Sequence, residues 1–496
     1  MFNRVLTGIT VLGFVLRVYH LDHYGLWIDE GSSYVFAKRN IWSILTNTGE
    51  TNPPLYYLIL HFWMLAFGSS EWVMRFLSVI FSSVAIVLTG RLGKLLYNEQ
   101  VGLVAALLLS IMAFPIHYAR EVRTYSLFLA ATAGSFLFFY KSIPGDKKAD
   151  WSFYVIFTTI LCYAHNYWVF LFLGQSIFIL IFYAKNKNIL IRVLIAQSVV
   201  LILFSPWLLV LLKQAQRIGV QGSWLPDATL SVFGSAVYKG VAFFSPEWPY
   251  LLIVIPIGIL AVLPFTRAHP PRQSRPQLGQ YQFSVQQLRN NCLLLVWYLF
   301  SVFIPFIISN SGTSIFHSRY TIGAIPAFYL LLANGIWKLP ARFLRMGFIV
   351  IILAASAINL RYYYKNPAIG FSTEFWREKI YFIKSQLLSG QDVIVIAPGY
   401  AKRVFDYYAY GENKGAYAFN PNNYPDDGSI RQWLDTVTSG KKRLWLFSRP
   451  GAKSSTLNLL QNVLGSRYKE IPLHAQIPYI DKVPIVVLYD VMVKPS

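Results

Sequence analysis

Long apolar runs separated by short polar segments dominate the first 362 residues of this 496-residue chain. A helix needs about 20 mainly apolar residues to cross a hydrocarbon core, and runs of about 18 residues or more recur between Val5 and Tyr362. Charged residues make up only 13% of the chain, whereas soluble domains carry about 25%. A soluble fold is therefore excluded, and we expect a polytopic α-helical membrane protein.

The spacing of the apolar runs predicts about eleven transmembrane helices. They are expected near residues 4–20, 73–93, 101–116, 124–140, 152–165, 168–184, 193–212, 250–266, 292–309, 320–337 and 346–362. No small-residue cleavage site follows the first run, so we expect a retained helix rather than a signal peptide. Residues 54–68 are too short to span and are predicted to lie at the membrane interface as a helix, and residues 267–291 are predicted to be a polar inner loop.

The distribution of lysine and arginine predicts the orientation of the chain. Basic residues outnumber acidic ones in alternate loops, and such loops face the cytoplasm. With the N-terminus inside, an odd number of spans places everything after residue 362 outside. The net charge of +22 is spread over many short loops, so it indicates topology and not a nucleic-acid partner.

Residues 363–496 have the mixed pattern of a small α/β domain on the outer side of the membrane. Ser372 or Thr373 is predicted to cap a helix that runs to about Leu388, with Glu374 in its first turn. Strands are expected near 393–397, 444–447 and 485–489, and a second helix near 457–464. This part contains no phosphate-loop motif and no metal-ligand spacing.

The outer loop 21–72 contains the adjacent acidic residues Asp29 and Glu30, next to Trp27. Two carboxylates in an aromatic, partly desolvated setting can supply a base toward a hydroxyl group. The alternative is a helix N-terminus, with Asp29 as the cap and Glu30 in the first turn. Both interpretations remain open at this level.

A second polar cluster, Arg120, Glu121 and Arg123, follows the third predicted span on the outer side. Guanidinium groups match phosphate oxygens in bidentate geometry, so a phosphorylated lipid head is a suitable ligand. The structural alternative is that Arg120 and Glu121 pair with each other or anchor lipid headgroups.

Two further outer positions carry candidate phosphate ligands. His165 lies in a very short turn between two spans, where it can bind a phosphate or a metal or cap a helix. Arg319 precedes Tyr320 at the outer end of the tenth span. Arg319 can bind phosphate or extend toward lipid headgroups as a snorkelling side chain.

Together these segments resemble the GT-C glycosyltransferases, in the branch similar to protein O-mannosyltransferases and to the lipid A aminoarabinose transferase. The resemblance covers roughly residues 1–340. The residues that carry it are Trp27-Ile28-Asp29-Glu30, Asn52-Pro53-Pro54-Leu55-Tyr56-Tyr57, Glu71-Trp72-Val73-Met74-Arg75-Phe76-Leu77-Ser78, Arg123-Thr124-Tyr125-Ser126-Leu127, Arg319-Tyr320 and Pro326. With the pattern of apolar runs, we expect a catalytic transmembrane domain over residues 1–362 and a separate outer domain over 363–496.

The resemblance implies transfer of a sugar from a polyprenyl-phosphate donor to an acceptor hydroxyl outside the cytoplasmic membrane. Asp29 would be the general base, Glu30 would orient it or the acceptor, and Arg123 and Arg319 would hold the departing phosphate. The other substrate-binding residues that we expect are Asn52, Tyr56, Arg75, Arg120, Glu121, Tyr125, His165 and Tyr320.

Partners of the chain would be the lipid donor, a glycan, lipid or protein acceptor, and the bilayer, with no nucleic acid. Relatives often have Lys or His at the position of Asn52, which can donate a hydrogen bond but carries no charge. Some relatives use a divalent metal ion near this loop, so that cofactor is left open.

Two other classes of function compete with this interpretation. A secondary transporter or a flippase of lipid-linked substrates would place ionisable residues near the bilayer midplane, often in related halves, whereas the candidate charges here lie at helix ends. A non-catalytic membrane scaffold would tolerate the loss of the Asp29 carboxylate.

Overall fold

The computed structural model describes residues 1–46, 49–145, 147–221, 225, 227–239, 278–365, 374–409, 416–449, 455–473 and 485–492. The chain divides into two compact units. The membrane unit comprises residues 1–21 and 39–365, and the α/β unit comprises residues 22–38 and 366–496. The segment that contains the acidic pair therefore groups with the C-terminal residues, although it follows directly on the first helix.

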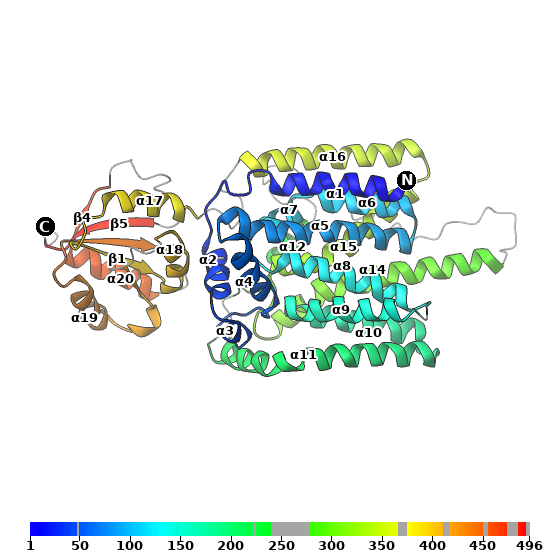
Figure 1. The fold of residues 1–496 in the computed structure, drawn as a ribbon, viewed down its shortest axis with the longest axis horizontal. Helices are drawn as coiled ribbons and strands as arrows, with labels where there is room; N and C mark the ends of the chain where they lie inside the picture. Colours follow the sequence, from blue (N-terminus) through cyan, green and yellow to red (C-terminus); the bar gives the residue numbers. More distant parts are fainter. Residues whose placement is uncertain are drawn as a thin grey trace. The chain divides into compact units, whose positions relative to one another are not determined.

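The membrane unit is a bundle of helices that run side by side (Figure 1). Its helices are α1 (Phe2–Val18), α3 (Ile41–Leu45), α4 (Leu55–Phe67), α5 (Glu71–Leu96), α6 (Glu99–Ile111), α7 (Ala113–Ala119), α8 (Tyr125–Ser142), α9 (Lys148–Ala164), α10 (Trp168–Tyr183), α11 (Lys187–Gln221), α12 (Leu230–Lys239), α14 (Leu278–Asn310), the 3-10 helix η2 (Ser318–Ala324), α15 (Ile325–Lys338) and α16 (Arg342–Lys365). Helix α5 packs against α1, α6 and α8.

The helices agree with the predicted positions of the spans, apart from residues 250–266, which lie outside the described part of the chain. Among the described residues, five helical segments are long and apolar enough to cross a membrane. A sixth is added if α6 and α7, which are bent by 60° at Met112, form one span. The interfacial segment is helical as predicted, as α4.

The prediction of a polar inner loop over 267–291 is wrong for its second half, because α14 already begins at Leu278. The sequence from Gln280 to Asn291 contains neither Pro nor Gly and has four Gln residues, which favour helices even where no apolar face is present. Hydropathy alone does not detect such a polar helical extension.

Small residues bring α5 and α6 into close contact. A Cβ atom added at Gly93 would lie 2.7 Å from the Cα atom of Gly102, and one added at Gly102 would lie 2.4 Å from the carbonyl oxygen of Gly90. Glycine is required at both positions because the two backbones touch, as in other closely packed membrane helices.

Arg17 is fully buried in α1, although the sequence places it within an apolar run. Its guanidinium group donates to the carbonyl oxygens of Leu109 and Ser110 at 2.8 and 3.0 Å and to the hydroxyl of Ser82 at 2.8 Å. Helix α6 ends at Ile111, so these two carbonyls belong to its last turn, where intrahelical donors are missing. Arg17 therefore stabilises the break between α6 and α7.

We expect Arg17→Met to lower the melting temperature of the purified protein by several degrees. The substitution leaves buried carbonyl groups without a donor, which costs about 1–3 kcal/mol for each group. Thermal unfolding in detergent measures the effect, with Arg91→Met as the control because Arg91 is exposed on α5. Equal melting temperatures for the two variants would contradict this role of Arg17.

The α/β unit contains a five-stranded mixed sheet with strand order β2-β1-β3-β5-β4. Its strands are β1 (Asp392–Ala397), β2 (Ala416–Ala418), β3 (Arg443–Ser448), β4 (Lys469–Ile471) and β5 (Ile485–Asp490). Its helices are α2 (Ile28–Ala37), α17 (Trp376–Gln386), α18 (Lys402–Tyr408), α19 (Asp427–Thr438) and α20 (Ser455–Arg467), with the short 3-10 helices η3 (Gly399–Ala401) and η4 (Pro421–Asn423). Strands β1, β2 and β3 are parallel, and β5 is antiparallel to both β3 and β4.

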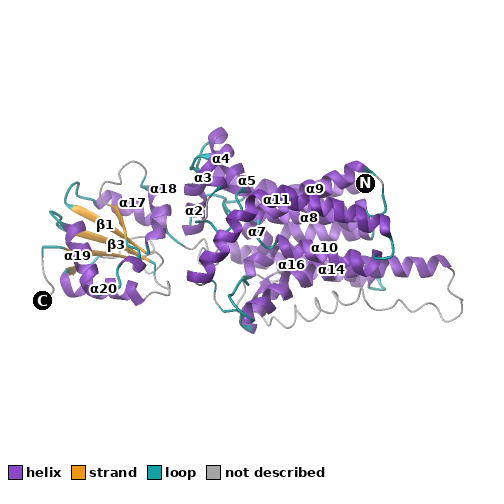
Figure 2. Ribbon diagram, turned by 90° about the horizontal axis from the view of Figure 1, so that it is seen from below, coloured by secondary structure: helices purple, strands orange, loops and turns teal. Residues whose placement is uncertain are grey.

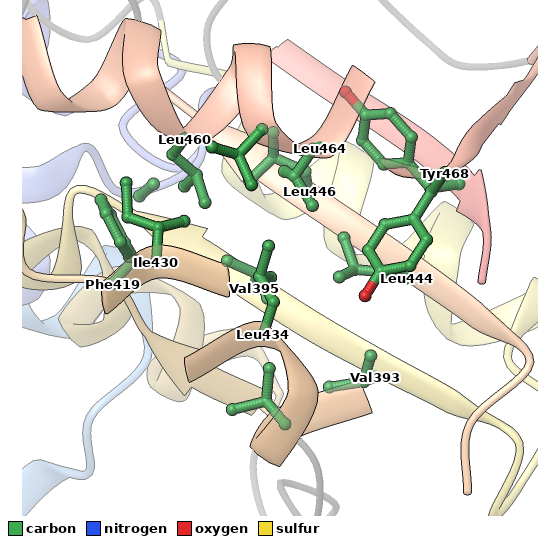
Figure 3. Close-up of a cluster of buried hydrophobic side chains, with 14 of the residues drawn as sticks. Val393, Val395, Phe419, Ile430, Leu434, Leu444, Leu446, Leu460, Leu464 and Tyr468 are labelled. Atoms are coloured by element: carbon green, nitrogen blue, oxygen red, sulfur yellow. The ribbon is translucent and has the colours of Figure 1, made fainter. Parts of the chain in front are cut away.

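Helices cover both faces of the sheet (Figure 2). On one face, Val395 of β1 and Leu446 of β3 pack with Leu434 of α19 and Leu460 of α20, as Figure 3 shows. On the other face, the ring of Phe447 stacks on Trp376 of α17, with ring centroids 6.0 Å apart. The α/β unit therefore has three layers, with the sheet between two layers of helices.

One detail of the C-terminal prediction differs from the structure. Helix α17 begins at Trp376, so Glu374 precedes the helix and does not lie in its first turn. Its side chain instead accepts a hydrogen bond from the indole of Trp376 at 2.8 Å. The proposed caps Ser372 and Thr373 lie outside the described residues.

Candidate active site

The acidic pair lies in the first turn of α2. The N-cap of this helix is Trp27, whose backbone N–H donates to Oε2 of Glu30 at 3.3 Å. Glu30 is fully buried, whereas Asp29 is partly exposed. A helix N-terminus favours anions, so both carboxylates lie where the helix dipole stabilises their charge. Glu30 has a local structural role, and Asp29 is the more accessible of the two.

In the membrane unit, Arg123, His165 and Arg319 come together from three different connections between helices. Arg123 lies between α7 and α8, His165 between α9 and α10, and Arg319 in η2. All three side chains are at least nine-tenths buried. We call these three residues the phosphate cluster, because two guanidinium groups and an imidazole match the oxygens of a phosphate.

Tyrosine rings surround the phosphate cluster. The guanidinium group of Arg319 lies 6.0 Å from the ring centroid of Tyr125 and 5.7 Å from that of Tyr320. The ring of His165 lies 4.8 Å from that of Tyr320. Such aromatic faces attract the cations and hold them in place without neutralising their charge.

His165 is an uncharged hydrogen-bond donor. Burial and then the positive charges of Arg123 and Arg319 lower its pKa to about 3. Its Nδ1 atom accepts a hydrogen bond from the backbone N–H of Tyr167 at 3.2 Å, which places the single proton on Nε2. The buried Nε2 atom has no hydrogen-bond partner among the described residues. It is therefore a donor available to an anion.

The low pKa of His165 predicts how acid affects the stability of the protein. Because the pKa is near 3 in the folded state and near 6.5 in the unfolded chain, protonation between these values favours unfolding. The stability that neutral His165 contributes is complete above pH 6.5 and is lost as the pH falls toward 3. We expect the difference in melting temperature between wild type and His165→Gln to shrink over this range. A difference that is constant from pH 7 to pH 4 would contradict this protonation state.

Residues of the loop before α4 complete the cluster. The carboxylate of Glu50 lies 3.9 Å from Nη2 of Arg123, and Nη1 of Arg123 donates to the hydroxyl of Tyr57 at 3.3 Å. Asn52 donates its side-chain amide to Glu50 at 3.2 Å. Asn52 thus orients the acidic neighbour of Arg123.

Glu121 pairs with His117 at the end of α7, where Nε2 of His117 lies 3.2 Å from Oε1 of Glu121. Both side chains are almost completely buried. The hydroxyl of Tyr363 in α16 lies 3.5 Å from Nδ1 of His117. Glu121 therefore lies next to the predicted arginines in sequence, but its carboxylate lies beside the imidazole of His117.

Three other predicted substrate ligands make structural contacts. Arg75 donates to the carbonyl oxygen of Leu21 at 2.9 Å, and the hydroxyl of Tyr56 lies 2.9 Å from that of Ser78. Arg120 donates to the carbonyl oxygens of Tyr19 and His20 and lies over the rings of Tyr363 and Tyr364. These contacts hold connections between helices.

Sequence reasoning did not include Glu50, Tyr57, His117 or Tyr118 in the site. The ring of Tyr118 lies 5.1 Å from that of Tyr125. Adjacent side chains of a helix point in different directions, so the two tyrosines of the Pro-Pro-Leu-Tyr-Tyr segment have different neighbours. Tyr57 was therefore a candidate separate from Tyr56. Nothing in the local sequence distinguishes Glu50.

A divalent metal ion has little support from the side chains near this loop. Within the described ranges, no three His, Cys, Asp or Glu side chains gather in a way that could hold a metal. One oxygen of Glu50 accepts from the backbone N–H and the side chain of Asn52, and Nε2 of His165 carries a proton. These two residues do not fit a metal ion, and we derive no step that uses one.

Comparison with known proteins gives one match to a family model. Residues 51–210 match the family model described as dolichyl-phosphate-mannose-protein mannosyltransferase. No curated protein matches the chain by sequence. The matched region contains Asn52, α4, Arg123 and His165 but not Glu50, the acidic pair or Arg319.

Solved structures extend the likeness to nearly the whole chain. The archaeal oligosaccharyltransferase AglB from Archaeoglobus fulgidus, in complex with an inhibitory peptide and a dolichol-phosphate, is 13% identical with a TM-score of 0.54, over 98% of this chain and 77% of that one. ArnT from Cupriavidus metallidurans, bound to undecaprenyl phosphate, is 11% identical with a TM-score of 0.53, over 99% of both chains. At these identities the likeness establishes the fold, and a transporter is not favoured. The chain therefore shares its fold with these two proteins, and its residues 51–210 match the family model of dolichyl-phosphate-mannose-protein mannosyltransferases.

Proposed function

We propose that the protein transfers a sugar from a polyprenyl-phosphate donor to an acceptor hydroxyl on the outer side of the cytoplasmic membrane. The observation that carries this proposal is the convergence of Arg123, His165 and Arg319, which offers two cations and a neutral donor to one anion. Structures of this fold with dolichol-phosphate and with undecaprenyl phosphate support a donor of this class.

In the proposed reaction, Asp29 removes the proton of the acceptor hydroxyl while its oxygen attacks the anomeric carbon of the sugar. The bond between that carbon and the phosphate oxygen breaks, and its electron pair remains on the phosphate. Arg123, Arg319 and Nε2–H of His165 stabilise the charge that develops there. In-line attack inverts the anomeric configuration.

The remaining predicted residues support these groups in the proposal. Glu30 keeps Asp29 oriented through the first turn of α2. Tyr125 and Tyr320 line the phosphate cluster, and Asn52 orients Glu50. Four predicted ligands have contacts that suit a role in positioning the surrounding helices and not in touching the substrate. They are Tyr56, Arg75, Arg120 and Glu121.

The proposed topology has eleven spans, with the catalytic transmembrane domain over residues 1–362 and an outer α/β domain over 363–496. Cysteine labelling of intact cells tests it, in a Cys292→Ser background. We expect a membrane-impermeant maleimide to label Thr46→Cys from outside and Asn188→Cys only after permeabilisation. The reverse pattern would contradict the orientation.

The activity is tested with purified protein and a panel of polyprenyl-phosphate sugars, together with peptide, glycan and lipid acceptors. We expect consumption of at least one donor with release of the lipid phosphate. The double variant Arg123→Gln/Arg319→Gln is the matched control and should not consume that donor. Consumption of no donor by folded protein across a broad panel would count against a transferase of this class.

A further inference from the structure

The helix that carries the acidic pair is held by residues far away in the chain. Within the α/β unit, α2 packs on α18. A Cβ atom added at Gly31 would lie 2.7 Å from the Cα atom of Val404, so α2 and α18 touch at their backbones. Arg403 of α18 lies 4.8 Å from the ring centroid of Phe36. Helix α2 is thus a fixed part of the α/β unit.

The chain just before α2 is held in the same way. Arg377 of α17 donates to the carbonyl oxygens of Asp22 and His23 at 3.0 and 2.7 Å. The backbone N–H of Leu26 donates to the hydroxyl of Tyr408. These contacts fix the entry of the chain into α2.

Glu374 makes the contact closest to the acidic pair. Its Oε2 atom accepts a hydrogen bond from the backbone N–H of Ile28 at 3.1 Å, and Oε1 accepts from Nε of Arg449 at 2.8 Å. With the indole of Trp376, three donors surround this carboxylate, which is only 5% exposed. Ile28 is the first residue of α2, so Glu374 satisfies one of the backbone N–H groups that a helix start leaves open.

The chemistry of Glu374 suits a fixed anchor. Burial raises its pKa, and the charge of Arg449 opposes that shift. A buried carboxylate is costly to maintain unless it is paired and hydrogen-bonded, so its position follows from its partners. A small shift of Glu374 would move Ile28 and therefore Asp29, the next residue.

We propose that Glu374 and Arg449 are positioning residues for Asp29, and that the α/β unit serves the reaction by holding α2 in its catalytic orientation. This inference rests on the proposed function, in which Asp29 is the general base. A base displaced by about 1 Å loses about 10²-fold in rate. The binding of the lipid phosphate, which uses other residues, should not depend on this anchor.

The same unit contains a matched control. Asp392 of β1 is also buried and accepts from Arg443 at 2.7 Å, from the indole of Trp445 at 3.0 Å and from the backbone N–H of Leu388 at 3.1 Å. It therefore has the same three kinds of donor as Glu374. Its backbone partner belongs to the α/β core and not to α2, so Asp392→Asn and Asp392→Ala report the general cost of losing such an anchor.

The experiment compares Glu374→Ala, Glu374→Gln and Arg449→Lys with the Asp392 variants in full-length protein. Hydrogen exchange is measured at the backbone amides of residues 26–31. Lipid-phosphate affinity is measured with undecaprenyl phosphate, and the kinetics of transfer are measured with the donor that the panel identifies. For Glu374→Ala we expect faster exchange in this segment and a kcat about 10- to 100-fold lower, with unchanged donor KM and unchanged lipid-phosphate affinity. Glu374→Gln keeps an acceptor oxygen, so its loss should be smaller.

The outcomes separate this inference from the function on which it rests. Inactive Asp29→Asn together with fully active Glu374→Ala, or equal losses in the Glu374 and Asp392 variants, would overturn the positioning role alone. Normal activity of Asp29→Asn would overturn the assignment of the base, and the positioning role with it. If Glu374→Ala does not fold, Glu374→Gln and Asp392→Asn provide the test. Slower turnover and faster exchange in Glu374→Gln but not in Asp392→Asn would support the inference. Normal turnover and normal exchange in Glu374→Gln would overturn it.

Discussion

Replacement of Asp29 by Asn should lower the rate of sugar transfer by about 10²- to 10⁴-fold, the usual contribution of a general base. Asn keeps the size and the hydrogen-bonding capacity of the side chain but cannot accept the proton of the acceptor hydroxyl. Expression, melting temperature and affinity for undecaprenyl phosphate should stay at wild-type values, because the phosphate cluster is unchanged. Product formation with the identified donor measures the effect.

Two neighbouring substitutions make this result specific. Asp22→Asn changes an exposed acidic residue of the same segment and should have no effect on transfer. Glu30→Gln keeps an oxygen that accepts from the N–H of Trp27, so its loss should be much smaller than that of Asp29→Asn. A more severe effect of Glu30→Gln would assign the base to Glu30 instead.

Replacement of Arg319 by Gln should lower kcat/KM by about 10²- to 10³-fold, as is usual when one donor to a developing oxyanion is removed. The guanidinium group of Arg319 lies over the rings of Tyr125 and Tyr320 and near His165, where burial strengthens its interaction with an anion. Affinity for undecaprenyl phosphate should fall as well. Lysine at this position keeps the charge but not the bidentate geometry and should give an intermediate value.

A comparison of four arginines tests whether the cluster is specific. Arg123→Gln should resemble Arg319→Gln. Arg120→Gln should lose less than tenfold, because Arg120 donates to backbone carbonyl groups and stacks on two tyrosines. Arg91→Gln removes an exposed arginine of α5 and should match wild type. Equal losses at Arg120 and Arg319 would contradict the phosphate cluster as defined here.

Most of the membrane unit could be predicted from apolar runs, because a hydrocarbon core accepts only long apolar helices. The error at α14 has the same origin. Its first half, from Leu278, is polar, and hydropathy does not detect a helix that continues past the apolar segment. The strands β1, β3 and β5 were also predictable, since short β-rich runs bounded by turn residues favour strands.

The sequence by itself determined which residue types were candidates, since charged residues at the ends of apolar helices are costly unless they are used. Only the tertiary structure decided which of them meet. Arg123, His165 and Arg319 come from connections up to nearly 200 residues apart in the chain, whereas Arg75 and Arg120 bind the backbone carbonyl groups of Leu21 and His20.

The acidic pair shows the same division. Its place after the first helix was visible in the sequence, but the hydrogen bond from the preceding residue, Ile28, to Glu374, 346 residues further along, was not. Local patterns report the direction of side chains relative to their own helix or strand, and a hydrogen bond between distant segments leaves no local trace. The fold therefore supplies the partners of Asp29, Arg123 and Arg319, and the sequence supplies their chemistry.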